Sequence, residues 1–351
     1  MSTKLAAKAA FAQRLLHWFD QHGRKDLPWQ QNIKPYRVWL SEIMLQQTQV
    51  STVIPYYLRM SEAYPNVQAL AAAPLDEILH HWTGLGYYAR ARNLHKCAQI
   101  ISTELDGVFP DTVEQLEALP GIGRSTAGAI CAIAYNRHYA ILDGNVKRVL
   151  ARHSAIAGWP GKSAVAKNLW EIAEGHTPTQ RTGDYTQAIM DLGATLCTRT
   201  KPACSQCPVN ADCQAFARDE TQLYPGKKPP KTTPVRQTLL LLIRDQQNRV
   251  LLQQRPPSGI WGGLWSFPEC PSESELNASC AQLGISVDNY QVADTQRHTF
   301  SHFHLDYTPV HINTSGTTTR IADSSQRWVV PTAHGEIGLP APILTLLQSL
   351  K

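Results

Sequence analysis

Apolar residues recur at steps of three and four positions through most of the first 218 residues. Between residues 38 and 54, for example, this spacing places the apolar side chains on one face of a helix. Residues 1–20 begin the chain with a similar amphipathic pattern. The pattern predicts further helices over residues 67–81, 90–104, 113–119, 124–136, 146–157 and 163–174. We therefore expect this part of the chain to be all-α.

The pattern changes after residues 224–237, which are rich in proline and lysine. Such a composition is typical of an exposed, semi-extended linker. Residues 238–256 then predict two strands joined by a polar turn at 245–248. Residues 297–312 and 325–331 are further strand candidates. This part of the chain is predicted to be α+β, with an antiparallel sheet.

A chain of 351 residues is too long for one ordinary hydrophobic core. We expect an all-α domain over 1–224, a linker over 225–236 and a smaller α+β domain over 237–351. The formal charge is +3 over 1–225, +4 over 226–236 and −2 over 237–351. A basic first part and a basic linker favour a polyanionic partner, whereas the last part has no such charge.

No apolar run approaches the roughly 20 residues that a membrane span requires. The N-terminal segment lacks the continuous apolar core of a signal peptide, since His17 and Asp20 interrupt it. Hydrophobic residues make up 43% and charged residues 17% of the chain, as in globular proteins. We expect a cytoplasmic protein with no membrane partner.

Four cysteines lie close together near the end of the helical part. Cys197, Cys204, Cys207 and Cys213 have the spacing C-x6-C-x2-C-x5-C, and the other four cysteines are scattered. Clustered thiols in a cytosolic protein indicate a metal centre rather than disulfides. Zinc and an iron–sulfur cluster both accept four thiolates, and the spacing alone leaves both open. Between the first two cysteines stand two basic residues, Arg199 and Lys201, which suit a phosphate contact.

A glycine-containing turn at residues 119–123, LPGIG, separates two predicted helices. A nucleotide-binding Walker loop would follow a strand and carry a lysine after its last glycine, and neither holds here. We interpret the segment as a helix–hairpin–helix, in which the backbone N–H groups of Gly121 and Gly123 face a phosphate at a helix N-terminus. A tight turn without a ligand is the alternative.

Two carboxylates stand in unusual surroundings. Glu42 lies beside the apolar residues of its predicted helix and is followed by polar residues. Asp143 precedes another predicted helix. Either has a structural explanation, since a Ser–Glu pair can start a helix and an aspartate before a helix is a common N-cap.

The motifs occur together in one order: SEIMLQQTQV (41–50), GLGYYARARNLH (84–95), LPGIGRST (119–126), LDGNVKRVLAR (142–152) and the cysteine cluster. This order resembles the helix–hairpin–helix DNA glycosylase superfamily, which includes endonuclease III. Glu42 in its motif and the C-terminal domain single out the adenine DNA glycosylase family, and the resemblance covers essentially the whole chain. It implies removal of adenine mispaired with 8-oxoguanine or guanine in duplex DNA, one 4Fe–4S cluster, and a monomer.

The resemblance also implies roles for the two carboxylates. Glu42 corresponds to the acid that gives a proton to the leaving adenine, and burial would keep it protonated near neutral pH. Asp143 corresponds to the carboxylate that stabilises the positively charged sugar, as in glycoside hydrolysis. Asn145 resembles the asparagine that supports this aspartate and the sugar.

Contacts to DNA follow from the same resemblance. Gln47 and Tyr87 match positions beside the mispair, where a base must leave the duplex. Gln187 matches a residue that hydrogen-bonds the flipped adenine, and Trp29 is expected to line its pocket. Lys147 is expected to contact a phosphate.

Ser125 stands where related glycosylase/lyases have a lysine that forms a Schiff base. A serine has no amine, so we expect a hydrolase that does not cut the strand. A lyase of the endonuclease III type is therefore disfavoured. A non-catalytic iron–sulfur DNA sensor would require neither Glu42 nor Asp143.

The C-terminal part resembles a Nudix-like fold through the motif WGGLWSFPE (261–269) and its strand pattern. The segment after Glu269 lacks the glutamates with which Nudix hydrolases hold Mg²⁺, so we expect lesion recognition rather than hydrolysis of pyrophosphates. Phe300, Ser301 and His302 match the family's lesion-reading loop. His302 and His304 would share one strand face, but a metal site there lacks a third ligand.

Overall fold

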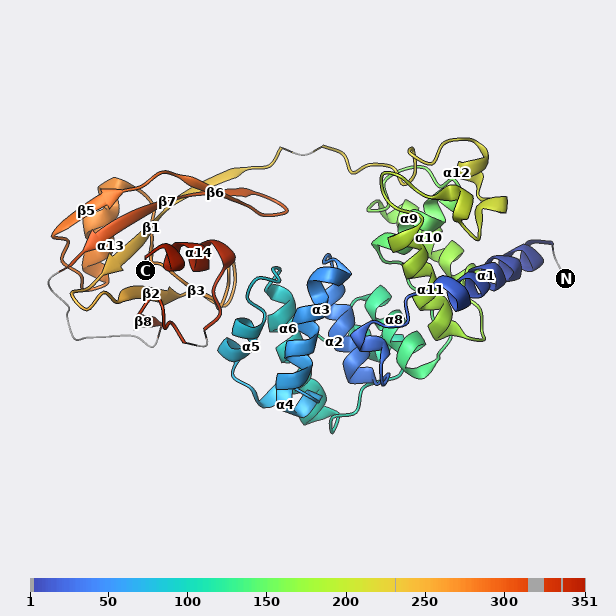
Figure 1. Cartoon of the computed structure of the whole chain (residues 1–351), viewed down its shortest axis with the longest axis horizontal. Helices are drawn as coiled ribbons and strands as arrows, with labels where there is room; N and C mark the ends of the chain where they lie inside the picture. The colour runs from blue at the N-terminus through green and yellow to red at the C-terminus, as the bar shows by residue number, and fades with distance from the viewer. Residues whose placement is uncertain (1–2, 231, 315–324, 336, 351) are drawn as a thin grey trace. The chain divides into compact units, whose positions relative to one another are not determined.

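The computed structural model describes residues 3–230, 232–314, 325–335 and 337–350, and the side chains from residue 10 onwards within these ranges (Figure 1). The chain divides into two compact units. The first comprises Met1–Ala72 and Asn93–Pro230, and the second comprises Ala73–Arg92 and Lys231–Lys351. In the described part of the chain, none of the helices combines the length and the apolar character of a membrane span.

The first unit is helical. Its helices are α1 (Thr3–His22), α2 (Pro35–Leu45), α3 (Val50–Ala63), α4 (Val67–Ala72), α6 (Ala89–Glu104, which starts in the second unit), α7 (Val113–Glu117), α8 (Arg124–Tyr135), α9 (Gly144–His153), α10 (Ser163–His176), α11 (Thr182–Thr195) and α12 (Gln214–Ala217). Short 3-10 helices cover Pro28–Gln30, Cys204–Gln206 and Asn210–Asp212. The helical prediction for this part is confirmed.

One core of this unit joins α1, α9, α10 and α11. Phe11 and Leu15 of α1 pack with Leu150 of α9, Leu169 of α10 and Ile189 of α11, and all five are buried. The core fixes the positions of α9 and α11. As a result, side chains at the start of α9 and along α11 face neighbouring helices in a defined geometry.

Two of the predicted helices are divided in the structure. The pattern over residues 38–54 falls on α2 and α3, which are separated by a turn in which Gln47 has φ 58°. The pattern over 67–81 falls on α4 and on α5 (Leu75–His81), separated at Pro74. Proline disfavours a helical conformation for the residue before it, which explains this break.

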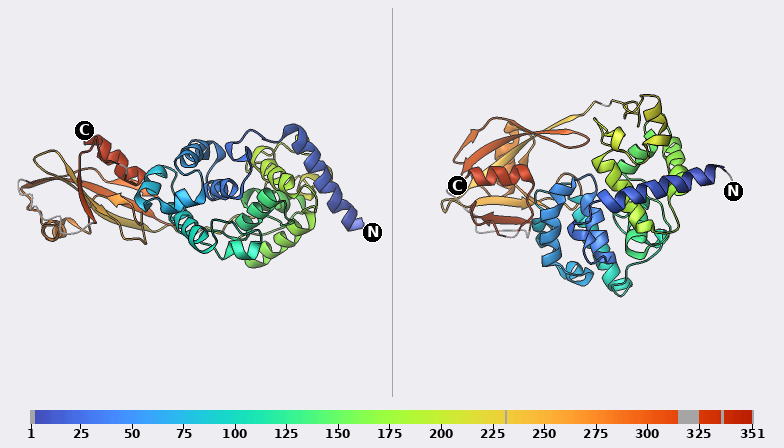
Figure 2. Two further views of the ribbon diagram at one scale, coloured as in Figure 1. Left: turned by 90° about the horizontal axis from the view of Figure 1, so that it is seen from below. Right: turned by 45° about the vertical axis from the view of Figure 1, so that its right-hand side comes forward.

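The second unit is built around a sheet. Its strands are β1 (Val235–Arg244), β2 (Val250–Gln254), β3 (Trp265–Ser266), β4 (Glu269–Cys270), β5 (Asn289–Val292), β6 (Gln296–Thr299), β7 (His304–Asn313) and β8 (Gln326–Val329). The main order is β3-β2-β1-β7-β5, with β4 beside β1, β6 beside β7 and β8 beside β2. The helices are α5, α13 (Leu276–Gln282) and α14 (Ala341–Ser349). Figure 2 shows α14, in red, lying along the sheet.

Two expectations for this unit were wrong. The sheet is mixed, because β1 and β7 run parallel from Val235↔His304 to Arg244↔Asn313. A connection of about 60 residues joins these two strands, which is more than the roughly 12 residues that a parallel crossover requires. The predicted single strand over 297–312 is a hairpin of β6 and β7, joined by a turn at residues 300–303.

Candidate active site

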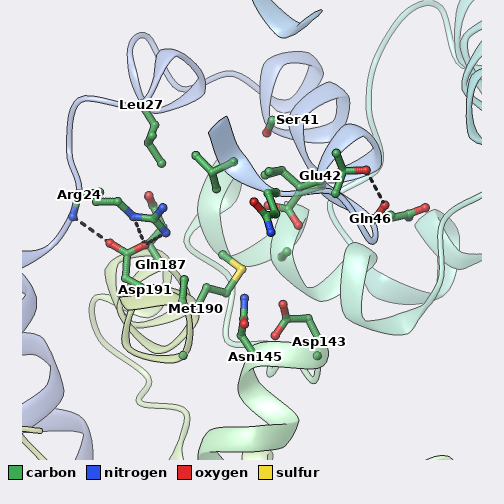
Figure 3. A pocket seen from close by; sticks show the side chains of 18 of the residues that line it. Arg24, Leu27, Ser41, Glu42, Gln46, Asp143, Asn145, Gln187, Met190 and Asp191 are labelled. Carbon is green, nitrogen blue, oxygen red and sulfur yellow. Dashed lines mark hydrogen bonds and ion pairs between the residues drawn. The ribbon is translucent and has the colours of Figure 1, made fainter. Parts of the chain in front are cut away.

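A large pocket lies within the first unit, with a volume of about 1260 Å³. Its walls come from the Pro28–Gln30 turn, α2, α8, the start of α9 and α11 (Figure 3). Of the predicted site residues it brings together Trp29, Glu42, Gln47, Ser125, Asp143, Asn145, Gln187 and Arg199. Segments more than 150 residues apart in sequence therefore contribute to one cavity.

Glu42 lies in the middle of α2, one position from the buried Ile43 and Met44. Its neighbours fix the helix against the core, and Glu42 itself faces the pocket (Figure 3). Burial raises the pKa of its carboxyl group to about 8, and the negative charge of Asp143 adds to the shift. Glu42 is therefore largely protonated at neutral pH, when a carboxylic acid in water would be ionised.

Asp143 is the N-cap of α9, and its Oδ1 accepts a hydrogen bond of 2.8 Å from the backbone N–H of Val146. Burial raises its pKa, while hydrogen bonds from the backbone of Val146 and Asn145 act in the opposite direction. The structural explanation for this aspartate is thus correct, and the same carboxylate lines the pocket. One oxygen caps the helix, and the group contributes negative charge opposite Glu42.

Asn145 is held by an arginine on the next turn of α9. Arg148 donates to Asn145 Oδ1 at 2.8 Å, and also to the carbonyl oxygens of Gly193 and Cys197, each at 2.7 Å. A Cβ atom on Gly193 would lie 2.6 Å from Cβ of Asn145, so only glycine allows α11 to approach α9 this closely. The orientation of the Asn145 amide is therefore fixed by packing and hydrogen bonds.

Gln187 projects from α11 into the opposite end of the pocket (Figure 3). Its Oε1 accepts a hydrogen bond from Nε2 of Gln30, which also donates to the carbonyl oxygen of Arg24 at 2.9 Å. The backbone N–H of Leu27 donates to Oε1 of Gln30 at 3.2 Å. Trp29 of the same turn is buried and lines the pocket. This end combines an aromatic wall with oriented amide groups.

Sequence reasoning missed Arg24, Gln30 and Asp191. Arg24 and Asp191 form an ion pair with Arg24 Nη2 2.5 Å from Asp191 Oδ1, and the carboxylate also accepts from the backbone N–H of Arg24 at 2.8 Å. Asp191 stands four positions after Gln187 and thus on the same helical face, which is a signal that the sequence contains. Arg24 and Gln30 belong to an irregular segment without periodicity, so no comparable signal exists for them.

The predicted hairpin separates α7 from α8, and Gly123 is the N-cap of α8. Gly121 has φ 80°, and a Cβ atom there would lie 2.9 Å from Asn93 Cβ, so glycine is required by both conformation and space. Among the described residues, no atom would contact a Cβ on Gly123, and Gly123 itself is exposed. Ser125 Oγ accepts from the backbone N–H of Leu142 at 3.0 Å, and this bond ties α8 to the segment before Asp143.

Both residues expected beside the mispair have left-handed backbone conformations. Gln47 has φ 58° and is exposed at the pocket, while Tyr87 has φ 50° and a side chain about half exposed. Such values are uncommon for residues other than glycine and concentrate at functional sites. Tyr87 belongs to the second unit, where the guanidinium group of Arg90 lies 5.4 Å from its ring centre.

Three basic residues were expected to contact phosphates. Lys147 lies on α9 near Asp143, and its positive charge opposes the rise that burial causes in the pKa of this carboxylate. Arg199 is exposed and lines the pocket, whereas the exposed Lys201 does not. Lys201 lies in a turn closed by a bond of 2.8 Å from Thr198 Oγ1 to its carbonyl oxygen.

The four clustered cysteines line one small cavity of about 20 Å³. Burial raises the pKa of the Cys207 thiol to about 12, and the other three cysteines add to the shift, which reflects their proximity. The buried Arg152 donates to Cys197 Sγ at 3.4 Å and to the carbonyl oxygen of Thr198 at 2.7 Å. In the described parts of the chain, no three His, Cys, Asp or Glu side chains are arranged around a single metal ion.

In the second unit, the turn at 300–303 is closed by a bond of 2.9 Å from the backbone N–H of Phe300 to the carbonyl oxygen of Phe303. Ser301 and His302 are exposed at its tip, and Phe303 is buried. His302 lies in the turn and His304 in β7, so the two histidines do not share a strand face as expected. His304 Nδ1 is instead 2.9 Å from Thr299 Oγ1.

Comparisons with known proteins match both units. The family model of the HhH-GPD superfamily base excision DNA repair proteins matches residues 40–174, and the model of the NUDIX domain matches residues 239–349. Among solved structures, a thermostable thymine-DNA glycosylase has a TM-score of 0.54 at 25% identity, covering 61% of this chain and 98% of its own. An endonuclease III in a non-covalent DNA complex has a TM-score of 0.52 at 21% identity, covering 62% and 99%. The predicted fold class is confirmed.

Two relatives match most of the chain. The adenine DNA glycosylase of Buchnera aphidicola subsp. Acyrthosiphon pisum is 39% identical over 98% of each chain. The human adenine DNA glycosylase is 36% identical, covering 86% of this chain and 67% of its own. The similarity thus includes both units and the segment that connects them.

Proposed function

This chain belongs to the adenine DNA glycosylases, and we propose that it hydrolyses adenine from mispairs with 8-oxoguanine or guanine in duplex DNA without cutting the strand. The observation that carries the proposal is the pair of carboxyl groups in one pocket. Glu42 has its pKa raised to about 8, while Asp143 accepts a hydrogen bond from the N-terminus of α9. Two carboxyl groups in such different environments can take different roles, one as the proton donor and the other as the anion.

Glu42 supplies the proton. Cleavage of the N-glycosidic bond leaves its electron pair on adenine, and a proton from Glu42 to the adenine ring neutralises that charge. Water then adds its hydroxyl group to C1′ of the sugar, and its remaining proton restores the acid. The acid must be protonated at neutral pH for this step, as the raised pKa of Glu42 permits.

Asp143 stabilises the positive charge that develops on the sugar when the bond breaks. Its position at the pocket wall is held by its role as the cap of α9. Asn145 supports the sugar beside it. Arg148 donates a hydrogen bond to the oxygen of the Asn145 amide and thereby fixes the orientation of this group. The amide nitrogen remains available as a donor.

The adenine enters the pocket after it leaves the duplex, at a cost of about a few kcal/mol. Gln47 and Tyr87, both in left-handed conformations, each match a position that contacts the mispair. Trp29 provides an apolar wall for the base, and Gln187 a hydrogen-bonding edge. Adenine presents both donors and acceptors, so an amide is a suitable partner.

The DNA backbone binds the surrounding surface. Gly121 and Gly123 direct backbone N–H groups to a phosphate at the start of α8, where the partial positive charge of the helix N-terminus also favours an anion. Lys147, Arg199 and Lys201 add positive charge. We assign residues 1–224, including the Ala73–Arg92 segment of the second unit, to the catalytic domain, and 225–236, whose last two residues begin β1, to the linker.

Ser125 accounts for base release without strand cleavage. A lyase requires an amine near C1′ to form a Schiff base. Ser125 lines the pocket at the matching position, and its hydroxyl group accepts a structural hydrogen bond from Leu142. A strand break that arises without alkali would contradict this part of the proposal.

We assign the four cysteines around their common cavity to a 4Fe–4S cluster. A tetrahedral zinc ion would require the thiolates to converge on one point at about 2.3 Å. A cubane cluster binds each thiolate to a different iron, so the sulfurs surround a larger volume. The chain supplies four thiols at one cavity, which is the donor set that such a cluster requires. Iron analysis and visible absorption of the purified protein test this assignment against zinc.

Residues 237–351 read the oxidised guanine through Phe300, Ser301 and His302. Ser301 and His302 are exposed and polar, as contacts to a base edge require. The protein acts as a monomer on double-stranded DNA in the cytoplasm. Ultracentrifugation of the complex with one duplex tests the stoichiometry.

Base release in a single turnover tests the proposal as a whole. The substrates are duplexes with adenine opposite 8-oxoguanine, guanine or thymine, and released adenine is measured directly. We expect release from the first two and negligible release from the adenine–thymine pair. Equal release from all three would contradict the mispair specificity, and no release would contradict the activity.

A further inference from the structure

We propose that Trp261 and His298 are positioning residues that hold the lesion-reading turn, residues 300–303, in its binding conformation. The inference rests on the proposed function of this turn. It concerns an aromatic cluster beneath the turn, formed by Trp261, His298 and Phe300. Neither Trp261 nor His298 is at the exposed tip, so both act through the turn.

The three rings contact one another in pairs. His298 meets Phe300 edge to face, with ring centres 4.6 Å apart and planes at 85°. Trp261 lies 5.9 Å from His298 and 5.8 Å from Phe300, both at 49°. Edge-to-face and tilted arrangements at these separations are favourable for aromatic pairs. Phe300 is therefore fixed from two directions, by a strand residue and by a residue of a separate loop.

The other side of the turn is fixed as well. Phe300 and Phe303 stack with centres 4.4 Å apart and planes at 18°, and the Phe303 side chain is buried. The guanidinium group of Arg236 lies 4.8 Å from the centre of the Phe303 ring. With both ends of the turn anchored, the exposed side chains of Ser301 and His302 project from a fixed frame.

Trp261 has a backbone conformation that a large residue rarely adopts. Its φ is 53°, and its side chain is buried. A residue with such a φ value is strained, and this conformation persists only where the surrounding structure enforces it. The loop is closed around it: the backbone N–H of Gly263 donates to the carbonyl oxygen of Pro256 at 3.0 Å, and that of Leu264 to the carbonyl oxygen of Trp261 at 2.9 Å.

The loop backbone approaches itself closely at the glycine after Trp261. A Cβ atom on Gly262 would lie 2.6 Å from the carbonyl oxygen of Pro257. The loop therefore holds the indole in one place, against Phe300 and His298. A rigid support lowers the ordering cost when a turn binds its target, because fewer side chains must be immobilised. Trp261 and His298 should thus strengthen recognition of the oxidised base specifically.

The test is the preference for 8-oxoguanine over guanine. Affinities are measured for duplexes that contain a non-cleavable 2′-fluoro adenosine opposite either base. We expect His298→Ala and Trp261→Leu to lower the preference about 3- to 10-fold, the range of one or two lost aromatic contacts. Affinity for the duplex with guanine should change less than about twofold, since the turn contributes little there.

Two variants separate positioning from general stability. His298→Phe keeps a ring at this position and should restore most of the preference. Arg297→Ala, on the same strand, removes an exposed ion pair with Asp306 and touches none of the rings, so the preference should not change. If His298→Ala unfolds the second unit, as seen by thermal melting, His298→Leu keeps the apolar bulk and should still lose the preference.

A double-mutant cycle tests whether the support acts through the turn. In the His298→Ala background, Ser301→Ala should have a smaller effect than in the wild type, because the serine is already misplaced. Additive effects, or an unchanged preference in both His298→Ala and Trp261→Leu, would overturn the inference. A wild-type protein with no preference would instead contradict the proposed reading of the lesion.

Discussion

The pocket of the helical unit and the turn of the sheet unit place their working groups in opposite environments. Glu42 and Asp143 are partly buried in the pocket wall, and burial raises the pKa of both. Ser301 and His302 are exposed, and only the rings that support them are covered. An acid that must be protonated at neutral pH requires burial, whereas a contact to a base edge requires access. Changes in the pocket should therefore affect chemistry on every mispair, and changes in the turn should affect only discrimination.

The largest expected effect is that of Glu42→Gln. The amide keeps the shape of the side chain but has no acidic proton, so base release should fall by about 10²- to 10⁴-fold on both mispairs. Single-turnover release and duplex affinity are measured together, and affinity should change little. A rate loss confined to the 8-oxoguanine mispair would contradict the separation of chemistry from recognition.

Asp143→Asn should have the next largest effect. Asparagine is as good an N-cap as aspartate, so α9 should remain intact, while the loss of negative charge should slow release by about 10²-fold or more. The matched control is Asp143→Ala, which also removes the cap. It should therefore have a free energy of unfolding about 0.5–2 kcal/mol lower than that of Asp143→Asn. Release rates and denaturant unfolding of both variants distinguish the two roles. Full activity in Asp143→Asn would show that Asp143 acts only as the cap of α9 and has no catalytic role.

Ser301→Ala changes the other region and should have a smaller effect. The loss of one hydrogen bond corresponds to about 2- to 10-fold in affinity. We expect this loss for the duplex with 8-oxoguanine and none for the duplex with guanine, while the rate of bond cleavage at saturation is unchanged. A slower chemical step in this variant would show that the turn is part of the catalytic machinery.

The remaining effect is on stability rather than on rate or affinity. The folded state holds a proton on Glu42 up to about pH 8, whereas the ordinary pKa is 4.5. The unfolded chain releases this proton earlier, so the free energy of unfolding should decline as pH rises from 4.5 towards 8, by at most about 1.4 kcal/mol per pH unit. Denaturant unfolding at several pH values should show a shallower decline in Glu42→Gln. Identical slopes would contradict the raised pKa.

The sequence predicted most of the helices because local periodicity determines them, but none of the predicted ranges covers α11. The division between α2 and α3 at Gln47 was not predicted, since the apolar spacing continues across the turn. The parallel pairing of β1 with β7 was also not predictable, because it depends on a crossover rather than on neighbouring residues. The split between β6 and β7 occurs at the very residues that form the proposed reading turn.

The candidate site was predicted where a motif marks it. Glu42 and Asp143 belong to such motifs, and the structure brings both to one pocket. Arg24 and Gln30 were missed because they lie in an irregular segment whose role arises only from packing against α11. Trp261 is another example, since its motif indicates a Nudix-like fold but not its contact with Phe300.

The pH dependence of single-turnover base release tests most directly whether Glu42 acts as a buried, protonated acid. The rate constant for adenine release opposite 8-oxoguanine should be nearly constant from neutral pH to about pH 8. Above this value it should fall about tenfold per pH unit, as the acid loses its proton. The residual activity of Glu42→Gln should show no such break. A wild-type rate that stays constant or rises well above pH 8 would contradict the account.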